Sequence, residues 1–182
     1  GDSYFALEKR DEAGRLYVGV LGTGVKSHAT AQVRVTSSLL QSVMPKHVPK
    51  IGEEGKEEAA KLPEDEFIPE ADPYGTLVWY FNSLRELGHA TTMVTGDIAE
   101  YLKGLCRRND IPYQYRRRIR EYIELTSRRD ANEIPDILSQ LERQWKPKPL
   151  ENAPPVDILL ATNMISVGVD VPRLGLMVVT GQ

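Results

Sequence analysis

The fold class is decided by one short apolar stretch, TLVWYFN at residues 76–82. Its central residues are apolar without interruption, which is typical of a strand that is buried on both faces of a sheet. Outward from this stretch, we expect further strands at residues 16–21, 119–126, 157–162 and 174–180. Residues 119–126 also fit one face of a helix, and we favour a strand there.

Helical patterns lie between the expected strands. Ser83 has the side chain of a helix N-cap, and Gly88 is expected to end the short helix that Ser83 begins. An earlier helix should close at Pro45, because proline cannot continue a helix. We expect helices at residues 29–44, 84–87, 98–108 and 132–145, the last with one apolar face formed by Ile134, Ile137, Leu138, Leu141 and Trp145.

This alternation predicts an α/β fold with a mostly parallel sheet and helices on both of its faces. In such sheets, ligands bind beyond the carboxyl ends of the strands. The loops that follow Asn82, Thr126 and Thr162 are therefore the places where binding residues are expected.

Charge is distributed unevenly along the 182 residues, although the net charge is only −3. Residues 51–73 carry nine acidic side chains, two lysines and three prolines, which predicts an acidic, solvated linker. We therefore divide the chain into a strand-helix element at residues 1–50, this linker, and a domain at residues 74–182. The net charge argues against a chain devoted to coating nucleic acid, but it does not exclude a local basic patch.

Residues 107–129 carry eight arginines against three acidic residues. The arginines could follow a phosphate backbone, and Tyr113, Tyr115 and Tyr122 could stack on bases. A solvated basic face is the commoner explanation, and both interpretations stay open. The arginines concerned are Arg107, Arg108, Arg116, Arg117, Arg118 and Arg120.

Several other classes of protein are disfavoured. The single cysteine, Cys106, cannot form an internal disulfide, and with only three histidines a structural zinc site is not expected. No apolar run is long enough to span a membrane, and no signal peptide is visible at the start. We expect a cytoplasmic chain that has no membrane partner and binds no metal through its own residues.

The functional inference depends on the segment ATNMISVGVDVP, residues 161–172. It begins at the carboxyl end of an expected buried strand. Small and hydroxyl residues such as Thr162 let a backbone approach a phosphate and supply donors to it. Gly168 permits a close approach, and Asp170 could accept a bond from a ribose hydroxyl. On these properties alone, an ordinary loop explains the segment equally well.

The pattern Ala-Thr-x5-Gly-x-Asp-x-Pro in this segment resembles motif V of superfamily 2 helicases, which lies in their second RecA-like domain. The resemblance implies that Thr162 and Asn163 contact the backbone of a bound nucleic acid. It also implies that Gly168 and Asp170 face the nucleotide, with Asp170 near the ribose.

Two weaker matches lie in the expected order along the chain. Residues 77–87 resemble motif IV, and ELTSR at residues 124–128 resembles the next motif that contacts phosphates. Taken alone, each is also explained by a buried strand that leads into a capped helix or a polar turn. Together they imply further nucleic-acid contacts by Asn82, Ser83, Thr126, Ser127 and Arg128.

Residues 74–182, with a looser likeness at residues 15–45, are similar to the helicase component of the DISARM anti-phage defence system and its bacterial relatives. This resemblance implies a RecA-like (P-loop NTPase-type) sheet and an ATP-dependent helicase or translocase. ATP and Mg²⁺ would bind in the intact protein, with this domain as one wall of the cleft and the first RecA-like domain of the same chain as the other. Nucleic acid, expected to be DNA, would be the partner.

The sequence departs from the helicase pattern in two ways. Motif VI with its arginine finger, which would follow Gln182, is absent, and so is the first RecA-like domain with its phosphate loop. The chain also starts at Gly1 and stops in an expected strand. We therefore expect an excised fragment, truncated at its C-terminus, that does not hydrolyse ATP on its own.

A glycine-rich stretch, GVLGTGVKS at residues 19–27, suggests a phosphate loop. However, Val25 separates Gly24 from Lys26, whereas the Walker pattern requires the lysine directly after the glycine. A turn into a helix explains the stretch better. Two other functions stay open: a phosphate-loop nucleotidase that uses Lys26 and Ser27, and a non-catalytic RecA-like module that binds nucleic acid or protein.

Overall fold

The stretch at residues 76–82 forms strand β3 (Leu77–Phe81) of a four-stranded sheet. The computed structural model describes residues 14–46, 49–51, 57–59, 62, 66–149, 154–162 and 171–180. In this part of the chain the strand order is β4-β5-β3-β6, with β4 at Tyr122–Leu125, β5 at Ile158–Ala161 and β6 at Leu176–Thr180. All three strand pairs are parallel, so the predicted α/β fold is confirmed, and the sheet is consistent with a RecA-like architecture.

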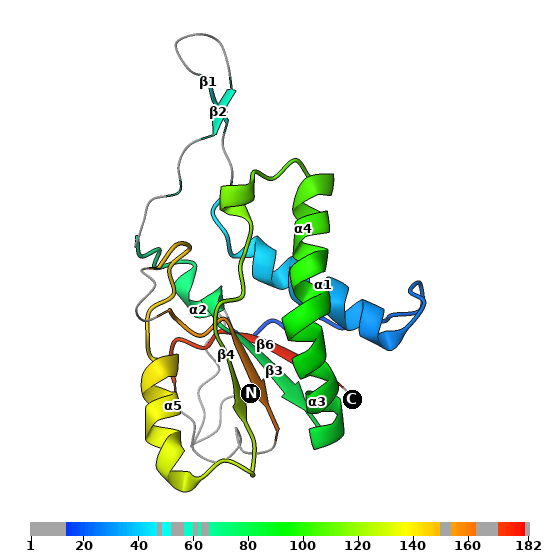
Figure 1. Ribbon diagram of the computed structural model, residues 1–182, viewed down its shortest axis with the longest axis vertical. Coiled ribbons are helices and arrows are strands. Elements are labelled where there is room, and N and C mark those ends of the chain that lie inside the picture. The colour runs from blue at the N-terminus through cyan, green and yellow to red at the C-terminus, as the bar shows by residue number, and fades with distance from the viewer. Residues whose placement is uncertain are drawn as a thin grey trace, which may run out of the picture.

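Helices cover both faces of the sheet, as Figure 1 shows. On one face lie α1 (His28–Ser42), α3 (Leu84–Thr92) and α4 (Ile98–Arg108), and on the other lies α5 (Ile134–Leu141). In the part of the chain that the structure describes, no helix combines the length and the apolar character needed to cross a membrane.

The strand residues alternate between two apolar clusters, because successive side chains of a strand point to opposite faces. Leu77, Trp79 and Phe81 of β3 enter the cluster beneath α1, α3 and α4. Val78 enters the second cluster, which contains Ile137 of α5. Burial on both faces explains why the strand sequence is apolar without interruption.

The helix that begins after Ser83 is longer than the sequence predicted. Ser83 caps α3 as expected, since its Oγ accepts a hydrogen bond from the backbone N–H of Glu86 at 3.3 Å. The expectation that Gly88 ends the helix is wrong, because α3 continues through a π-helical turn (Met93–Asp97) into α4. Gly88 is exposed while Leu87 and Ala90 are buried in the core, so packing compensates for the low helix propensity of glycine.

The helix expected at residues 132–145 is shorter than predicted. A 3-10 turn (Ala131–Glu133) leads into α5, which ends at Leu141, so Trp145 does not lie on its apolar face. Trp145 is instead buried in a third cluster with Met44 and Tyr115, and its backbone N–H donates to Oδ1 of Asp72 at 2.6 Å. Because Asp72 is distant in sequence, helical periodicity could not predict the position of Trp145.

The strand expected at residues 16–21 is wrong. The structure describes this segment without any strand, and its large apolar side chains are exposed, with Leu16 88% and Leu21 84% accessible. An apolar run forms a strand only where a neighbouring strand pairs with it, and no described residue does so here. The glycine-rich stretch after it therefore does not follow a strand, although it does turn into α1 as expected.

Some described residues of the acidic stretch at residues 51–73 belong to regular elements. Strands β1 (Pro49–Ile51) and β2 (Glu57–Ala59) pair antiparallel, and Asp72 begins the short helix α2 (Asp72–Gly75). Asp72 is buried, with only 8% of its surface accessible. Asp72, at the C-terminal end of this stretch, is therefore not solvated, while the division into residues 1–50, 51–73 and 74–182 stays a prediction.

Candidate nucleic-acid interface

The two threonines expected to contact nucleic acid, Thr126 and Thr162, lie side by side at the carboxyl edge of the sheet. Strands β4 and β5 are neighbours, with Leu125 paired to Ala161, and each threonine is the next residue along its strand. The backbone N–H of Thr162 donates to the carbonyl of Leu125 at 3.3 Å, which extends the ladder by one bond. Parallel pairing thus brings together two hydroxyl residues that are separated by 36 positions in the sequence.

The turn after β4 presents Ser127 and Arg128 outward. The Oγ1 of Thr126 accepts a hydrogen bond from the backbone N–H of Arg128 at 3.3 Å, and the carbonyl of Thr126 accepts from the N–H of Arg129 at 3.1 Å. These bonds fold the chain back within three residues. Ser127 and Arg128 are exposed beside the nearly buried Thr126, so hydroxyl donors and a guanidinium meet at one edge.

Charge at this edge is partly neutralised within the chain. Arg129 forms an exposed ion pair with Glu133 at 2.9 Å, and its Nε donates to the carbonyl of Glu124. The Glu124 carboxylate accepts from the hydroxyl of Thr91 on α3 at 2.9 Å. Among the described residues Arg128 has no ion-pair partner, so its guanidinium is the charge at this edge that is available to a phosphate.

Strand β3 ends at the same edge, next to β5. Tyr80 is paired with Ala161, so Asn82 and Ser83 follow one strand away from Thr162. The Ser83 hydroxyl is already used, because it caps α3 and donates to Oε2 of Glu86 at 3.2 Å. Asn82 is exposed. At this edge we therefore expect the N-terminal N–H groups of α3, rather than the Ser83 side chain, to be available to an anion.

One further hydroxyl, Thr180, lies at this edge on β6, and the sequence interpretation did not single it out. Its Oγ1 accepts a hydrogen bond from Nε1 of Trp79 at 2.8 Å, and the residue is 6% accessible. This bond satisfies the buried indole N–H, so Thr180 has a structural role. Three other expected site residues, Asn163, Gly168 and Asp170, lie outside the described residues.

The amino ends of the strands are joined by a buried ion pair that the sequence interpretation also missed. Nη2 of Arg117 donates to Oδ1 of Asp157 at 2.6 Å and to the carbonyl of Gly75 at 2.6 Å. Oδ2 of Asp157 accepts from the backbone N–H groups of Arg120 and Glu121. Burial lowers the pKa of the Arg117 guanidinium, and the carboxylate of Asp157 opposes that shift.

The inclusion of Arg117 in a solvent-facing basic cluster is therefore wrong. Its side chain is only 2% accessible and lies over the Trp145 ring, with 4.4 Å between Cζ and the ring centroid. Residue type alone gave no signal of this burial. The one available hint was an acidic residue, Asp157, at the start of an otherwise apolar strand.

A second, partly buried network surrounds Arg173, just before β6. Nη2 of Arg173 donates to Oδ1 of Asp72 at 2.9 Å, while its Nη1 donates to Oγ1 of Thr76 and to the carbonyl of Leu141. The Thr76 hydroxyl in turn donates to the carbonyl of Val156 at 2.6 Å. The guanidinium thus ties the start of β6 to α2 and to the end of α5.

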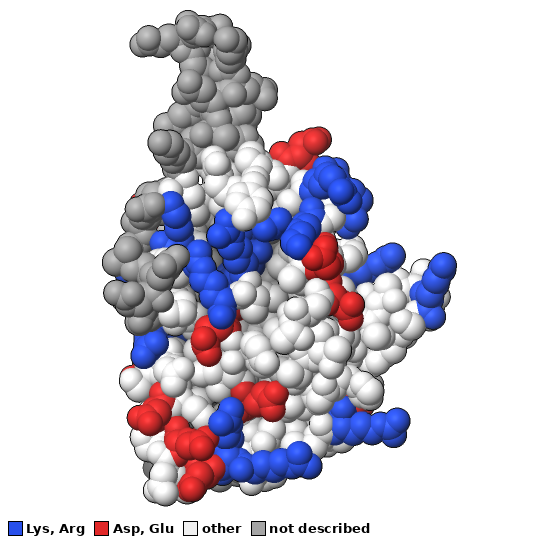
Figure 2. Space-filling view, in the orientation of Figure 1, with Lys and Arg blue, Asp and Glu red and all other residues white. Residues whose placement is uncertain are grey.

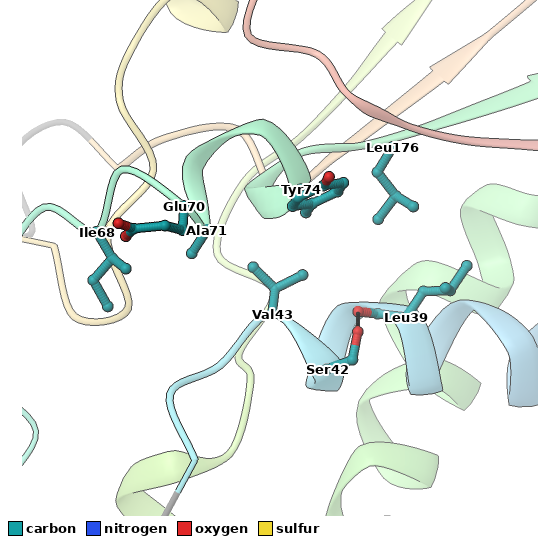
Figure 3. A pocket seen from close by; sticks show the side chains of 8 residues that line it. All are labelled: Leu39, Ser42, Val43, Ile68, Glu70, Ala71, Tyr74 and Leu176. Carbon is teal, nitrogen blue, oxygen red and sulfur yellow. Dashed lines mark hydrogen bonds between the residues drawn. The ribbon is translucent and has the colours of Figure 1, made fainter. Parts of the chain in front are cut away.

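The structure also contains an open pocket of about 360 Å³, remote from the carboxyl edge. It lies between the C-terminal end of α1, helix α2 and the first residue of β6, as Figure 3 shows. Its lining is mostly apolar, and Glu70 is its one charged residue. Among the described residues no cluster of His, Cys, Asp or Glu could hold a metal ion. The lining residues are Leu39, Ser42, Val43, Ile68, Glu70, Ala71, Tyr74 and Leu176.

No protein-family model matches this sequence. Over its whole length, however, the chain is 42% identical to a protein of Bacillus paralicheniformis. The chain is similar to DISARM protein DrmA. The similarity to DrmA supports a DISARM-type protein, and the alignment includes the carboxyl edge and both buried networks because it spans the entire chain. The chain spans 14% of the length of DrmA. The similarity therefore does not show the activity of a whole protein of that length.

Proposed function

We propose that this chain is part of an ATP-driven DNA helicase or translocase of superfamily 2 that acts in a DISARM-type phage-defence system. Its role there is to hold the backbone of a nucleic-acid strand at the carboxyl edge of the sheet. The observation that carries this proposal is the adjacency of Thr126 and Thr162 on neighbouring parallel strands. The similarity to DISARM protein DrmA supports the assignment to this kind of system.

The chemistry of the edge suits a phosphate backbone. Thr126 and Thr162 follow neighbouring paired strands, and exposed Ser127 and Arg128 extend this row of possible donors outward. Hydroxyl and guanidinium groups are among the donors that contact phosphate oxygens in protein–DNA complexes, and such contacts carry no sequence information directly. Such contacts suit an enzyme that moves along any sequence.

The N-terminus of α3 adds a further favourable element. It begins directly after β3, one strand away from Thr162, and its first N–H groups have no partner within the helix. The partial positive charge of a helix N-terminus favours an anion such as a phosphate. Glu86 in the first turn opposes this attraction, so we assign α3 a supporting role.

ATP, when bound in the intact protein, would supply the free energy that drives closing and opening of the cleft between two RecA-like domains. In this chain Gly168 and Asp170 are the residues proposed to face the nucleotide. Thr162 comes directly before the segment that contains them, so a shift of that segment would be transmitted to the strand contact.

The phosphate-loop alternative finds less support in the structure. Ser27 caps α1, with its Oγ accepting from the N–H of Thr30 at 3.2 Å and lying 2.9 Å from the Thr30 hydroxyl. The residues before the glycines form no strand, whereas a phosphate loop connects a strand to a helix. The alternative predicts tight ATP binding by the chain that is lost in Lys26→Ala.

The proposal is tested by titrating fluorescein-labelled oligothymidylate and, separately, ATP into the chain at two salt concentrations. We expect salt-sensitive strand binding that Thr162→Ala weakens about tenfold, together with little affinity for ATP. Thr95→Ala is the matched control, because Thr95 is an exposed threonine in the π-helical turn between α3 and α4. Strand binding that is unchanged in Thr162→Ala would contradict the proposal. Tight ATP binding that is lost in Lys26→Ala, together with no strand binding, would favour the nucleotidase.

A further inference from the structure

A group of arginines lies at the other end of β4 from Thr126. Arg107 and Arg108 end helix α4, and Arg116 and Arg118 follow in the segment that leads into β4. Figure 2 shows blue side chains gathered over this part of the molecule. Together with Tyr113 we call these four arginines the arginine–tyrosine surface.

The buried Arg117 explains why its neighbours face outward. Asp157 and the carbonyl of Gly75 hold the Arg117 side chain inside the protein. The backbone is extended at Arg116 (φ −75°, ψ 129°), and side chains of an extended chain alternate between two sides. Arg116 and Arg118 are therefore directed away from Arg117 by the same ion pair that buries it.

Tyr113 holds these two guanidinium groups in place. The Cζ atoms of Arg116 and Arg118 lie 4.5 Å and 4.7 Å from the centroid of the Tyr113 ring, and the tyrosine is 63% accessible. An arginine stacked on an aromatic ring uses its flat face, so the N–H groups at its edge remain available as donors. Such edges match the oxygen geometry of a phosphate.

Acidic neighbours do not neutralise this surface within the described residues. Neither Arg116 nor Arg118 has a carboxylate within ion-pairing distance in that part of the chain. The pKa of Glu100 on α4 is lowered chiefly by its pairing with Lys103, and the charge of Arg116 adds only a minor contribution. The dipole of α4 accounts for basic residues such as Arg107 and Arg108 in its last turn, but it does not account for Arg116 and Arg118.

We propose that the arginine–tyrosine surface is a second binding site for the phosphate backbone of a single-stranded nucleic acid. Arg118 is eight residues before Thr126, which is about 26 Å of extended chain at about 3.3 Å per residue, so the surface lies well away from the threonine edge. The proposal takes its partner class from the proposed function, but its site shares no residue with the carboxyl edge. A strand held at both places is fixed in direction across β4, which a single contact point cannot achieve.

The test compares Arg116→Gln/Arg118→Gln with the wild-type chain in titrations of labelled oligothymidylate of about 20 nucleotides, longer than a single-strand site of typical size. We expect about tenfold weaker binding at low salt. The slope of log K against log salt should fall by about 1.4, since each phosphate contact contributes about 0.7 for single strands. Tyr113→Leu, which releases both guanidinium groups while keeping their charge, should cause a smaller loss with an unchanged slope.

The charge-matched control is Arg34→Gln/Arg143→Gln, which removes two exposed arginines from other parts of the chain. If this control lowers affinity and slope as much as Arg116→Gln/Arg118→Gln does, the surface is not a site and the proposal is overturned. It is also overturned if polyglutamate competes for the surface as well as DNA does, which would indicate an acidic protein partner.

A further variant, Thr126→Val/Thr162→Val, separates this inference from the proposed function. If both sites contact the strand, the two double substitutions should weaken binding additively, as expected for distant sites. Loss of binding in the arginine variant alone would uphold the second site and contradict the proposed role of the carboxyl edge. Loss of binding in the threonine variant alone would uphold the role of the carboxyl edge and overturn the second site.

Discussion

Arg117 and Asp157 form a buried ion pair, 2.6 Å from Nη2 to Oδ1, that joins the amino ends of three strands. Asp157 precedes β5, accepts two backbone N–H groups at the entrance to β4, and gives its carbonyl to the N–H of Leu77 in β3. Among the described residues Nε and Nη1 of Arg117 find no hydrogen-bond partner, and the guanidinium lies over the Trp145 ring. The pair therefore fixes the register of the sheet from the end opposite to the candidate interface.

Arg117→Met should destabilise the chain by about 3–5 kcal/mol, because it leaves the buried carboxylate of Asp157 without its cation. Urea denaturation followed by circular dichroism measures the change. Arg129→Met is the control, since the Arg129–Glu133 pair is exposed and its loss should cost no more than about 0.5 kcal/mol. Equal effects of the two substitutions would show that the Arg117–Asp157 pair contributes no more to stability than a surface pair.

Two glycines should respond to alanine in opposite directions. A Cβ at Gly75 would lie 2.2 Å from Cγ of Trp145, so Gly75→Ala should destabilise the chain by about 1–3 kcal/mol through overpacking. A Cβ at Gly88 meets nothing within 4 Å on the exposed side of α3, so Gly88→Ala should stabilise it by about 0.5–1 kcal/mol. Thermal melting of both variants measures these shifts, and a lower Tm for Gly88→Ala would contradict the account of the continuous helix.

Arg173→Lys should cost about 1–3 kcal/mol, although it conserves the charge. Lysine lacks the planar fork that lets Arg173 contact Asp72, Thr76 and the carbonyl of Leu141 at once, so buried acceptors would lose their donors. Urea denaturation measures the loss. Arg143→Lys, at an exposed position, is the matched control and should change stability by less than about 0.5 kcal/mol. A loss for Arg173→Lys that does not exceed the control would refute the role of this network.

Cys106 should react slowly with a thiol reagent such as Ellman's reagent while the chain is folded. Burial raises the pKa of its thiol, so less thiolate is present at neutral pH, and only 4% of the residue is accessible. The rate should increase by at least about tenfold in urea, where the thiol regains its ordinary pKa and full access. Rapid labelling of the native chain at its single cysteine would show that this part of α4 opens readily.

The sequence predicted strands at the positions of β3, β5 and β6 from their apolar composition, whereas residues 119–126, which contain β4, fitted a helix face as well as a strand. Strands β3 and β5 are short apolar runs, and Ser83 marks the start of the helix after β3. Identical reasoning failed at residues 16–21, where an apolar run has no strand beside it in the described part of the chain. Periodicity describes a segment, whereas a strand also requires a neighbour.

The candidate interface could be predicted in part for a related reason. Thr126 and Thr162 follow strands, and parallel pairing must bring the carboxyl ends of adjacent strands together. The buried charges could not be predicted, because Asp72 in an acidic stretch and Arg117 in an arginine run resemble their exposed neighbours in type. Their burial depends on Arg173 and Asp157, which are distant in sequence and approach only when the sheet has formed.

The central claim is that a nucleic-acid strand binds at the carboxyl edge of the sheet, beside Thr126 and Thr162. Methyl NMR of threonine-labelled chain during titration with oligothymidylate tests it most directly, because it reports each threonine separately. The account predicts shifts for the methyl groups of Thr126 and Thr162, while Thr36 on α1 and Thr76 at the amino end of β3 stay unchanged. Saturable strand binding that leaves the signals of Thr126 and Thr162 in place would contradict it.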